Sequence, residues 1–337
     1  MLRTYKPLTK HSIFNYQKLI QHLVCEVWCN AEDGVTCESL LNAEFEAIYS
    51  AREWVKKSTD EIYNLCIDLD IKERTDIREA FVVNNSIDDL CEAVKLPIIL
   101  DSLSNDLNEK IKLFLIKCYS DLISANEKLD YYNALIKQNK SFKFCPCCGL
   151  LPIESMESKY REDNDHYLPK ALYPFASVNF DNLPPLCSKC NKKCKSTKNP
   201  FENGRKSFYP FKPLNNAFQI VITIKNSDAT NYLSLQQNEI ELSFNNDVDK
   251  VRTWDWLFNI KNRYVEEIRQ FSKTELRIIA SRFRKIHMRK QQISYEQILN
   301  DVIEEYNIDK YDDRKFLKSA FLAEMLAQPE WLAVYVP

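Results

Sequence analysis

Two Cys-x-x-Cys pairs restrict what this chain can fold into more than any other feature of its sequence. They are Cys145 with Cys148 and Cys187 with Cys190. Thiolates three residues apart on a tight turn can present two sulfurs to one ion, and structural Zn²⁺ takes four tetrahedral ligands. Gly149 suits such a turn, where a positive φ is often needed. The sequence therefore predicts a closed structural zinc site with four cysteine ligands. The gap between the pairs exceeds the roughly 15–20 residues of the simplest zinc signature, so an inserted element must fill it.

The neighbouring cysteines leave alternatives open. Cys147 could replace Cys148 as a ligand, although Cys145 with Cys148 has the better spacing. Cys194 follows the second pair and is expected to lie near the site without ligating. The plainer alternative is that all of these are core cysteines, because scattered cysteines usually behave as small buried hydrophobes. We expect that behaviour for the remaining six, which are Cys25, Cys29, Cys37, Cys66, Cys91 and Cys118.

The composition excludes several classes of protein. With only 3 glycines in 337 residues, neither G-x-G-x-x-G nor G-x-x-x-x-G-K can be built, which excludes the common nucleotide-binding fingerprints. The first residues hold no apolar run of signal-peptide type, and no segment reaches the ~18 consecutive apolar residues of a membrane span. We therefore expect a cytoplasmic protein with no membrane partner, whose cysteines are thiols or metal ligands and not disulfides.

The chain is expected to be α+β and predominantly helical, in three parts. Residues 1–140 are predicted to form a helical N-terminal domain. The clearest helix runs from Leu107 to Ile136, where apolar residues recur every three or four positions. Residues 141–212 hold the clustered cysteines and many prolines, which argues against long helices there.

Residues 213–337 are predicted to form a short β hairpin followed by a helical C-terminal domain. Segments 219–225 and 233–244 are rich in β-branched and alternating residues, which favours the hairpin. Ser272 with Glu275 and Ser294 with Gln297 have the spacing of capping boxes and predict helix starts. A last helix is expected over 312–327.

A second motif lies within the central part. Asp165 and His166 stand between the cysteine pairs, Asn182 follows, and Asn191 comes directly after Cys190. In this order, CPCCG, NDHYLPKALYPF and NLPPLCSKCNKKCKS resemble the HNH endonucleases, also called the ββα-metal or His-Me finger superfamily. The similarity is greatest to the subgroup in which a four-cysteine zinc site brackets the motif. It covers only the central part of the chain.

The resemblance implies a fold and a set of roles. Two short strands would hold DHYLP and NLPPLC, and a helix would begin near the second cysteine pair. Asp165 and Asn191 would ligate a catalytic Mg²⁺ or Mn²⁺, His166 would be the general base, and Asn182 would orient the loop and the histidine. The third residue of the family motif is usually His. This chain has Asn191 there, and Asn is a familiar alternative within the superfamily.

The chemistry of the residues agrees with these roles. Phosphodiester hydrolysis needs an activated water and a cation that neutralises charge on the phosphate. Carboxylate and amide oxygens suit a hard cation, and an imidazole with a reference pKa of ~6.5 can take a proton near neutral pH. Plainer roles also exist: Asp165 as a turn residue, His166 as a satisfied buried histidine, Asn182 as a structural amide, and Asn191 as a helix cap.

Positive charge gathers beside the motif, although the whole chain has a net charge of −2. Lysines there can neutralise phosphates without selecting a sequence, and a solvated face without a partner is the alternative. The lysine that the family often places three residues after Asn191 is Cys194 here. Lys193 or Lys195 could take its phosphate-contacting role. The expected nucleic-acid-binding residues are Lys192, Lys193, Lys195 and Lys198.

These observations predict a metal-dependent HNH endonuclease that cleaves nucleic acid, with double-stranded DNA as the expected substrate. HNH modules with large helical flanks occur in bacterial restriction and anti-phage systems, including the Septu type, where an ATPase is the partner. An ATPase that binds through the helical flanks is therefore an expectation from the resemblance. Two other classes remain open: a zinc-stabilised nucleic-acid-binding module without catalysis, and an interaction protein in which zinc only joins helical domains.

Overall fold

The computed structural model describes residues 1–337 except 101–102, 159, 215–217, 226–234, 290–292 and 329–337. Contacts within the chain group it into two compact units. We call residues 4–141 with 154–213 the module unit, and Met1–Arg3 with 142–153 and 214–337 the hairpin unit. The sequence predicted three parts, whereas residues 142–153 here pack with the C-terminal part of the chain.

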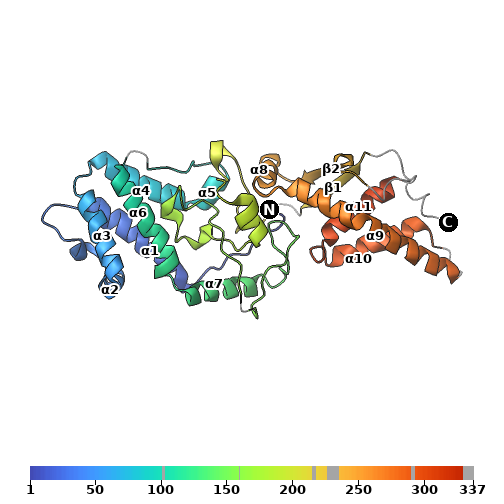
Figure 1. Ribbon diagram of the computed structural model, residues 1–337, viewed down its shortest axis with the longest axis horizontal. Coiled ribbons are helices and arrows are strands. Elements are labelled where there is room, and N and C mark those ends of the chain that lie inside the picture. The colour runs from blue at the N-terminus through green and yellow to red at the C-terminus, as the bar shows by residue number, and fades with distance from the viewer. Residues whose placement is uncertain (101–102, 159, 215–217, 226–234, 290–292, 329–337) are drawn as a thin grey trace. The chain divides into compact units, whose positions relative to one another are not determined.

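The structure confirms that the protein is predominantly helical with a small β component. No helix within the described ranges is long and apolar enough to cross a membrane. Among its described residues, the module unit contains seven α-helices (Figure 1): α1(Asn15–His22), α2(Ala43–Ala51), α3(Glu53–Cys66), α4(Ile71–Asn85), α5(Ile87–Cys91), α6(Asn105–Lys117) and α7(Ala125–Gln138). Short 3-10 and π-helical segments join them, among them η5(Cys118–Leu122), η6(Pro174–Ala176), η7(Phe180–Asn182) and η8(Lys189–Lys195).

The predicted single helix from Leu107 to Ile136 is wrong, because two helices stand in its place. α6 ends at Lys117, η5 follows, and α7 starts after Ser124. The Ser124 hydroxyl accepts a hydrogen bond from the amide of Glu127 at 3.2 Å, and the Glu127 carboxylate accepts one from the amide of Ser124 at 2.9 Å. This capping box satisfies the first amides of a new helix, so the apolar periodicity continues across a break in the helix.

Helices α4 and α7 hold the segments that carry the motif. The ring of Phe175 lies 5.4 Å from that of Phe81 on α4, and the ring of Phe180 lies 4.7 Å from that of Tyr131 on α7. The Asn85 amide at the end of α4 donates to the carbonyl of Phe175 at 3.2 Å. The motif is thus packed against the helices that precede it in the chain.

The strands expected at DHYLP and NLPPLC are replaced by one isolated antiparallel bridge, between Asn164 and Pro185. The amide of Asp165 donates to the carbonyl of Pro184 at 2.9 Å, and the amide of Tyr167 donates to the carbonyl of Asn182 at 3.0 Å. The two segments therefore run side by side, joined by a few backbone hydrogen bonds. Prolines in the second segment have no N–H to donate, which limits the ladder. The helix expected near the second cysteine pair is the π-helical η8.

The hairpin predicted in the C-terminal part is confirmed for the described residues. β1(Gln219–Ile224) pairs antiparallel with β2(Ile240–Asn245), from Gln219 opposite Asn245 to Ile224 opposite Ile240. Residues 233 and 234 of the predicted second strand lie outside the described residues. The short segment η11(Gln237–Glu239) precedes β2, and the described residues after the hairpin form α8(Val248–Phe258), α9(Ile260–Met288), α10(Tyr295–Ile308) and α11(Lys315–Ala327).

One predicted capping box is confirmed and one is wrong. Ser294 caps α10 together with Gln297. Ser272 instead lies buried inside α9, which runs on through it for 29 residues. Its hydroxyl donates to the carbonyl of Arg269 at 3.4 Å, a local bond that a helix interior tolerates.

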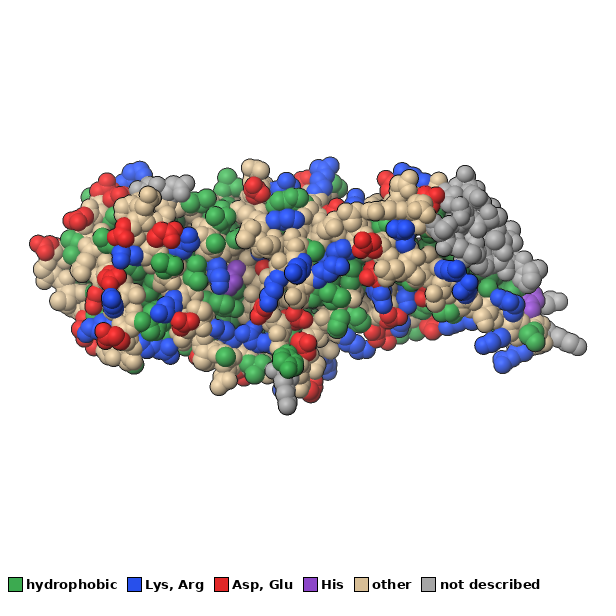
Figure 2. All heavy atoms as spheres, in the orientation of Figure 1, with side chains coloured by type: hydrophobic (Ala, Val, Ile, Leu, Met, Phe, Trp, Pro, Cys, Tyr) green, Lys and Arg blue, Asp and Glu red, His purple; other side chains and the backbone are tan. Residues whose placement is uncertain are grey.

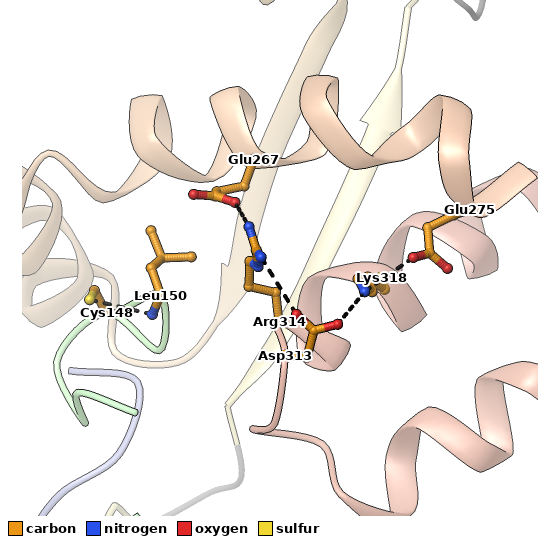
Figure 3. Close-up of polar contacts among 7 residues, drawn as sticks. All are labelled: Cys148, Leu150, Glu267, Glu275, Asp313, Arg314 and Lys318. Carbon is orange, nitrogen blue, oxygen red and sulfur yellow. Dashed lines mark hydrogen bonds and ion pairs between the residues drawn. The ribbon is translucent and has the colours of Figure 1, made fainter. Parts of the chain in front are cut away.

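A charge network connects α9 with the start of α11 (Figure 3). Arg314 pairs with Glu267 on α9, and the Lys318 ammonium lies 2.7 Å from Asp313 and 3.1 Å from Glu275. The φ angles of Asp313 and Arg314 are 40° and 59°, a left-handed turn that makes α11 begin at Lys315 and not at the predicted 312. These pairs fix the direction in which α11 leaves the turn.

Candidate functional site

Four cysteines form a buried cluster that could hold a metal ion. The Sγ atoms of Cys145, Cys148, Cys187 and Cys190 all lie within 4.8 Å of one another. Tetrahedral zinc with Zn–S distances of about 2.3 Å requires sulfurs roughly 3.8 Å apart, so the cluster fits with a small contraction. Cys148 and not Cys147 is the fourth member, as the spacing predicted.

The turn that carries the first pair requires glycine. Gly149 has a φ of +67°, and its amide donates to the carbonyl of Cys145 at 2.7 Å. A Cβ at this position would lie 2.5 Å from a methyl of Leu2 and 2.8 Å from the ring of Phe316. The amide of Leu150 then points at the Cys148 sulfur, 3.5 Å away (Figure 3). Such N–H donors favour a thiolate, the form that binds metal.

The second pair leads directly into the motif. Cys187 and Cys190 are buried, and the carbonyl of Cys187 accepts a hydrogen bond from the amide of Asn191 at 3.0 Å. This bond spans the start of η8, whose last residue is Lys195. A bound metal at the cysteines would therefore fix the position of Asn191. Cys194 was expected to lie near the site without ligating, and it is not one of the four clustered cysteines.

Asp165 is buried and paired with a lysine. Its side chain is 3% exposed, and Oδ1 lies 3.1 Å from the ammonium of Lys195, whose side chain is 1% exposed. Oδ2 is buried and has no hydrogen-bond partner among the described residues. Burial raises the pKa of the Asp165 carboxyl, and the adjacent Lys195 opposes that shift. Oδ2 is thus the carboxylate oxygen that Lys195 does not contact, and it is closed to solvent in this arrangement.

His166 is half-buried and held in one orientation. Its Nε2 lies 3.1 Å from the carbonyl oxygen of Ser177, and its ring meets that of Tyr119 edge-on at 4.6 Å. Because a carbonyl only accepts, Nε2 carries the proton and a neutral ring has its lone pair on Nδ1. Burial, followed by the nearby Lys170, lowers the pKa of His166 to about 3. The imidazole is therefore neutral at physiological pH.

Asn182 holds the backbone that follows the histidine. Its Oδ1 accepts from the amide of Leu168 at 2.6 Å, and its Nδ2 donates to the carbonyls of Leu168 at 3.1 Å and Ala176 at 3.2 Å. The side chain is fully buried. Asn182 thus joins the backbone of Leu168, two residues after His166, to that of Ala176, which precedes the Ser177 carbonyl that contacts His166.

Asn191 lies beside the segment that enters the motif. Its Nδ2 donates to the carbonyl of Asp163 at 3.3 Å, and the ammonium of Lys192 lies 2.7 Å from the Asp163 carboxylate. Nδ2 only donates, so Oδ1 is the atom of this side chain that could ligate a cation. Asn191 is thus tied to the backbone two residues before Asp165.

Three residues around His166 were assigned no role from the sequence, namely Tyr119, Lys128 and Lys170. The ammonium groups of Lys128 and Lys170 lie 4.7 Å and 5.0 Å from the ring centre of Tyr119 in η5. The same ring contacts His166. Burial lowers the pKa of both lysines. Periodicity placed Tyr119 on a helix and gave no sign that it would face the motif.

The expected nucleic-acid-binding lysines differ in position. Lys192 and Lys193 are exposed and Lys198 is half-buried, whereas Lys195 is turned inward to Asp165. Acidic and basic side chains are both spread over the face drawn in Figure 2, in keeping with a net charge of −2. The excess of positive charge is therefore limited to the segment near the motif and does not extend over the whole protein.

Comparison with protein-family models, with curated proteins and with solved structures gave no match for this chain.

Proposed function

We propose that this protein is a metal-dependent endonuclease of the HNH type, which hydrolyses phosphodiester bonds in DNA with His166 as the general base. One observation carries the proposal: the Nε2–H of His166 is committed to the carbonyl of Ser177 at 3.1 Å. The neutral ring must then accept a proton at Nδ1, and Asp165 stands next to it in the chain. A satisfied core histidine has no need of this neighbour.

The donor set fits a hard divalent cation. Asp165 offers Oδ2, which is buried without a partner among the described side chains, and Asn191 offers its amide oxygen. Mg²⁺ and Mn²⁺ prefer such oxygens. When bound, the cation would neutralise charge on the scissile phosphate. Zn²⁺ would occupy the four cysteines and hold Asn191 in place through Cys187 and Cys190.

His166 is suited to moving a proton once substrate is present. The cationic Lys170 helps to keep its pKa low in the free protein. A phosphate placed beside these groups would offset that positive charge and raise the proton affinity of Nδ1. Asn182 would maintain the loop, and Lys192 and Lys193 would bind the DNA backbone without selecting a sequence.

One observation favours a second candidate, a zinc-stabilised nucleic-acid-binding module without catalysis. Lys195 neutralises Asp165 internally, so a catalytic cation is not required to balance that buried charge. The basic surface and the zinc site would then suffice for binding.

A plasmid assay separates the two candidates. We expect the full chain with millimolar Mn²⁺ to convert supercoiled plasmid to nicked or linear product, and His166→Ala to lose this activity by about 100-fold or more, as for removal of a general base. His287→Ala, which removes an exposed imidazole far along the chain on α9, is the matched control and should cleave like the wild type.

Binding supplies the second readout. Salt-dependent gel shifts of a DNA duplex should be the same for wild type and His166→Ala. Cleavage that persists in His166→Ala would contradict the proposal. Binding without cleavage by any variant, at every metal concentration, would favour the non-catalytic module.

A further inference from the structure

The buried ion pair between Lys195 and Asp165 is not accounted for by the motif. Lys195 was expected to contact phosphate at the surface, yet its ammonium lies 3.1 Å from Asp165 Oδ1 and 2.8 Å from the carbonyl oxygen of His166. Taking an ammonium and a carboxylate out of water is costly, so this arrangement must be held by good geometry. It places an ammonium group at the carboxylate proposed to bind the catalytic cation.

Both oxygens of that carboxylate are closed to solution in this arrangement. Oδ1 is covered by Lys195, and Oδ2 is buried with no partner in the part of the chain that the structure describes. A cation that bound there would have a unit positive charge as its neighbour. The repulsion is strong over such distances because little water screens it.

We propose that Lys195 is a resident cation that competes with the divalent cation for Asp165, and so sets the metal affinity of the candidate site. This inference rests on the proposed function in one respect, the assignment of Asp165 as a metal ligand. Divalent metal binds Asp165 only when the ammonium withdraws.

The backbone next to Lys195 provides a place for that movement. Lys195 ends η8, and Ser196 follows with φ +49° and ψ −116°, a conformation that side-chain-bearing residues rarely adopt. The amide of Ser196 donates to the carbonyl of Asn191 at 2.9 Å, which closes the wide π-helical turn. Strained residues and π-turns often mark elements with two arrangements. Unwinding this last turn would carry Lys195 away from Asp165 while the cysteine ligands at its start remain in place.

Direct Mn²⁺ binding tests the inference without relying on activity. Zinc-loaded full chain is titrated with MnCl₂, and free Mn²⁺ is counted by its electron paramagnetic resonance signal. We expect Lys195→Met and Lys195→Gln to bind one Mn²⁺ with an affinity about tenfold or more above that of the wild type, since a like charge is removed. Met keeps the length of the side chain, and Gln keeps a donor for Oδ1 if Met leaves the carboxylate too poorly satisfied to fold.

Two controls define the site. Lys189→Met removes an exposed lysine from the same segment and should leave Mn²⁺ affinity at the wild-type value. Adding Asp165→Asn to Lys195→Gln should abolish the gained affinity. Equal affinity in wild type, Lys195→Met and Lys195→Gln would overturn the inference. So would tight wild-type Mn²⁺ binding that Asp165→Asn removes, a measurement that needs neither lysine variant to fold.

The Mn²⁺-binding experiment and the plasmid assay can fail independently of each other. Tighter Mn²⁺ binding by Lys195→Gln with no plasmid cleavage would uphold the competition and refute the nuclease. Cleavage that depends on His166, with Mn²⁺ affinity unchanged in the lysine variants, would uphold the nuclease and overturn the competition.

Discussion

The side-chain amide of Asn182 bonds both backbone groups of Leu168, with the Leu168 amide 2.6 Å from Oδ1 and the Leu168 carbonyl 3.1 Å from Nδ2. This is the pairing that one residue of a strand makes with another, supplied here by a side chain. It holds the loop after His166 where prolines prevent a longer ladder. The loop's position therefore depends on one buried amide.

Asn182→Ala should lower the free energy of unfolding by about 2–4 kcal/mol, because buried donors and acceptors of Leu168 and Ala176 lose their partner. Denaturant unfolding followed by fluorescence measures this. Asn64→Ala, on an exposed face of α3, is the control and should change stability by about 0.5 kcal/mol or less. A loss in Asn182→Ala no larger than in the control would show that the loop does not depend on this amide.

Gly149→Ala should destabilise the protein more than the same change at the other glycines. All three glycines have positive φ, but a Cβ meets atoms at 2.5 and 2.8 Å only at Gly149, whereas at Gly34 nothing lies within 4 Å. We expect about 1–2 kcal/mol for Gly34→Ala from the left-handed backbone alone, and a further 1–3 kcal/mol or so for Gly149→Ala from overpacking. Thermal unfolding of the two variants side by side measures the difference, and equal midpoints would contradict the predicted clash.

Glu162 should make stability fall as pH rises through the weakly acidic range. Burial raises its pKa to about 7 from 4.5, with Glu154 and Asp163 adding to the shift and Lys192 and an N–H of Ser188 opposing it. Between about pH 4.5 and 7 the folded chain therefore binds more protons than the unfolded chain, and its stability decreases with pH.

Glu162→Gln should remove that dependence. The variant should gain stability relative to the wild type at about pH 8 and show little gain at about pH 4.5, as measured by urea unfolding at both values. Glu202→Gln, at an exposed position, is the control. A difference between Glu162→Gln and wild type that does not change with pH would show that Glu162 titrates alike in both states.

Removal of the cluster metal should destabilise the protein. We expect one zinc per chain, released on chelation and absent from Cys187→Ser, with a fall in thermal midpoint of about 5 °C or more at roughly 2–4 °C per kcal/mol. Cys194→Ser should retain its zinc, because Cys194 is not among the four clustered sulfurs. Full zinc occupancy in Cys187→Ser, measured by atomic emission, would refute the site.

The sequence by itself determined features that depend on near neighbours. The spacing of Cys145 with Cys148 selected the members of the cluster, because two ligands on one turn need no information from elsewhere in the chain. Ser294 with Gln297 predicted a helix start, since a cap acts within one turn, and alternation predicted the β1–β2 hairpin.

Tertiary structure decided features where a distant group competes with the local pattern. Ser272 with Glu275 has a capping spacing, but packing of α9 buries both residues and the helix continues. Apolar periodicity from Leu107 to Ile136 continues across the break between α6 and α7 because each helix buries one apolar face. Lys195 belongs to a basic run that predicts a surface position, yet burial of Asp165 thirty residues earlier draws its ammonium inward. An unpaired buried carboxylate is costlier than the burial of one more charge beside it, and no local pattern records that balance.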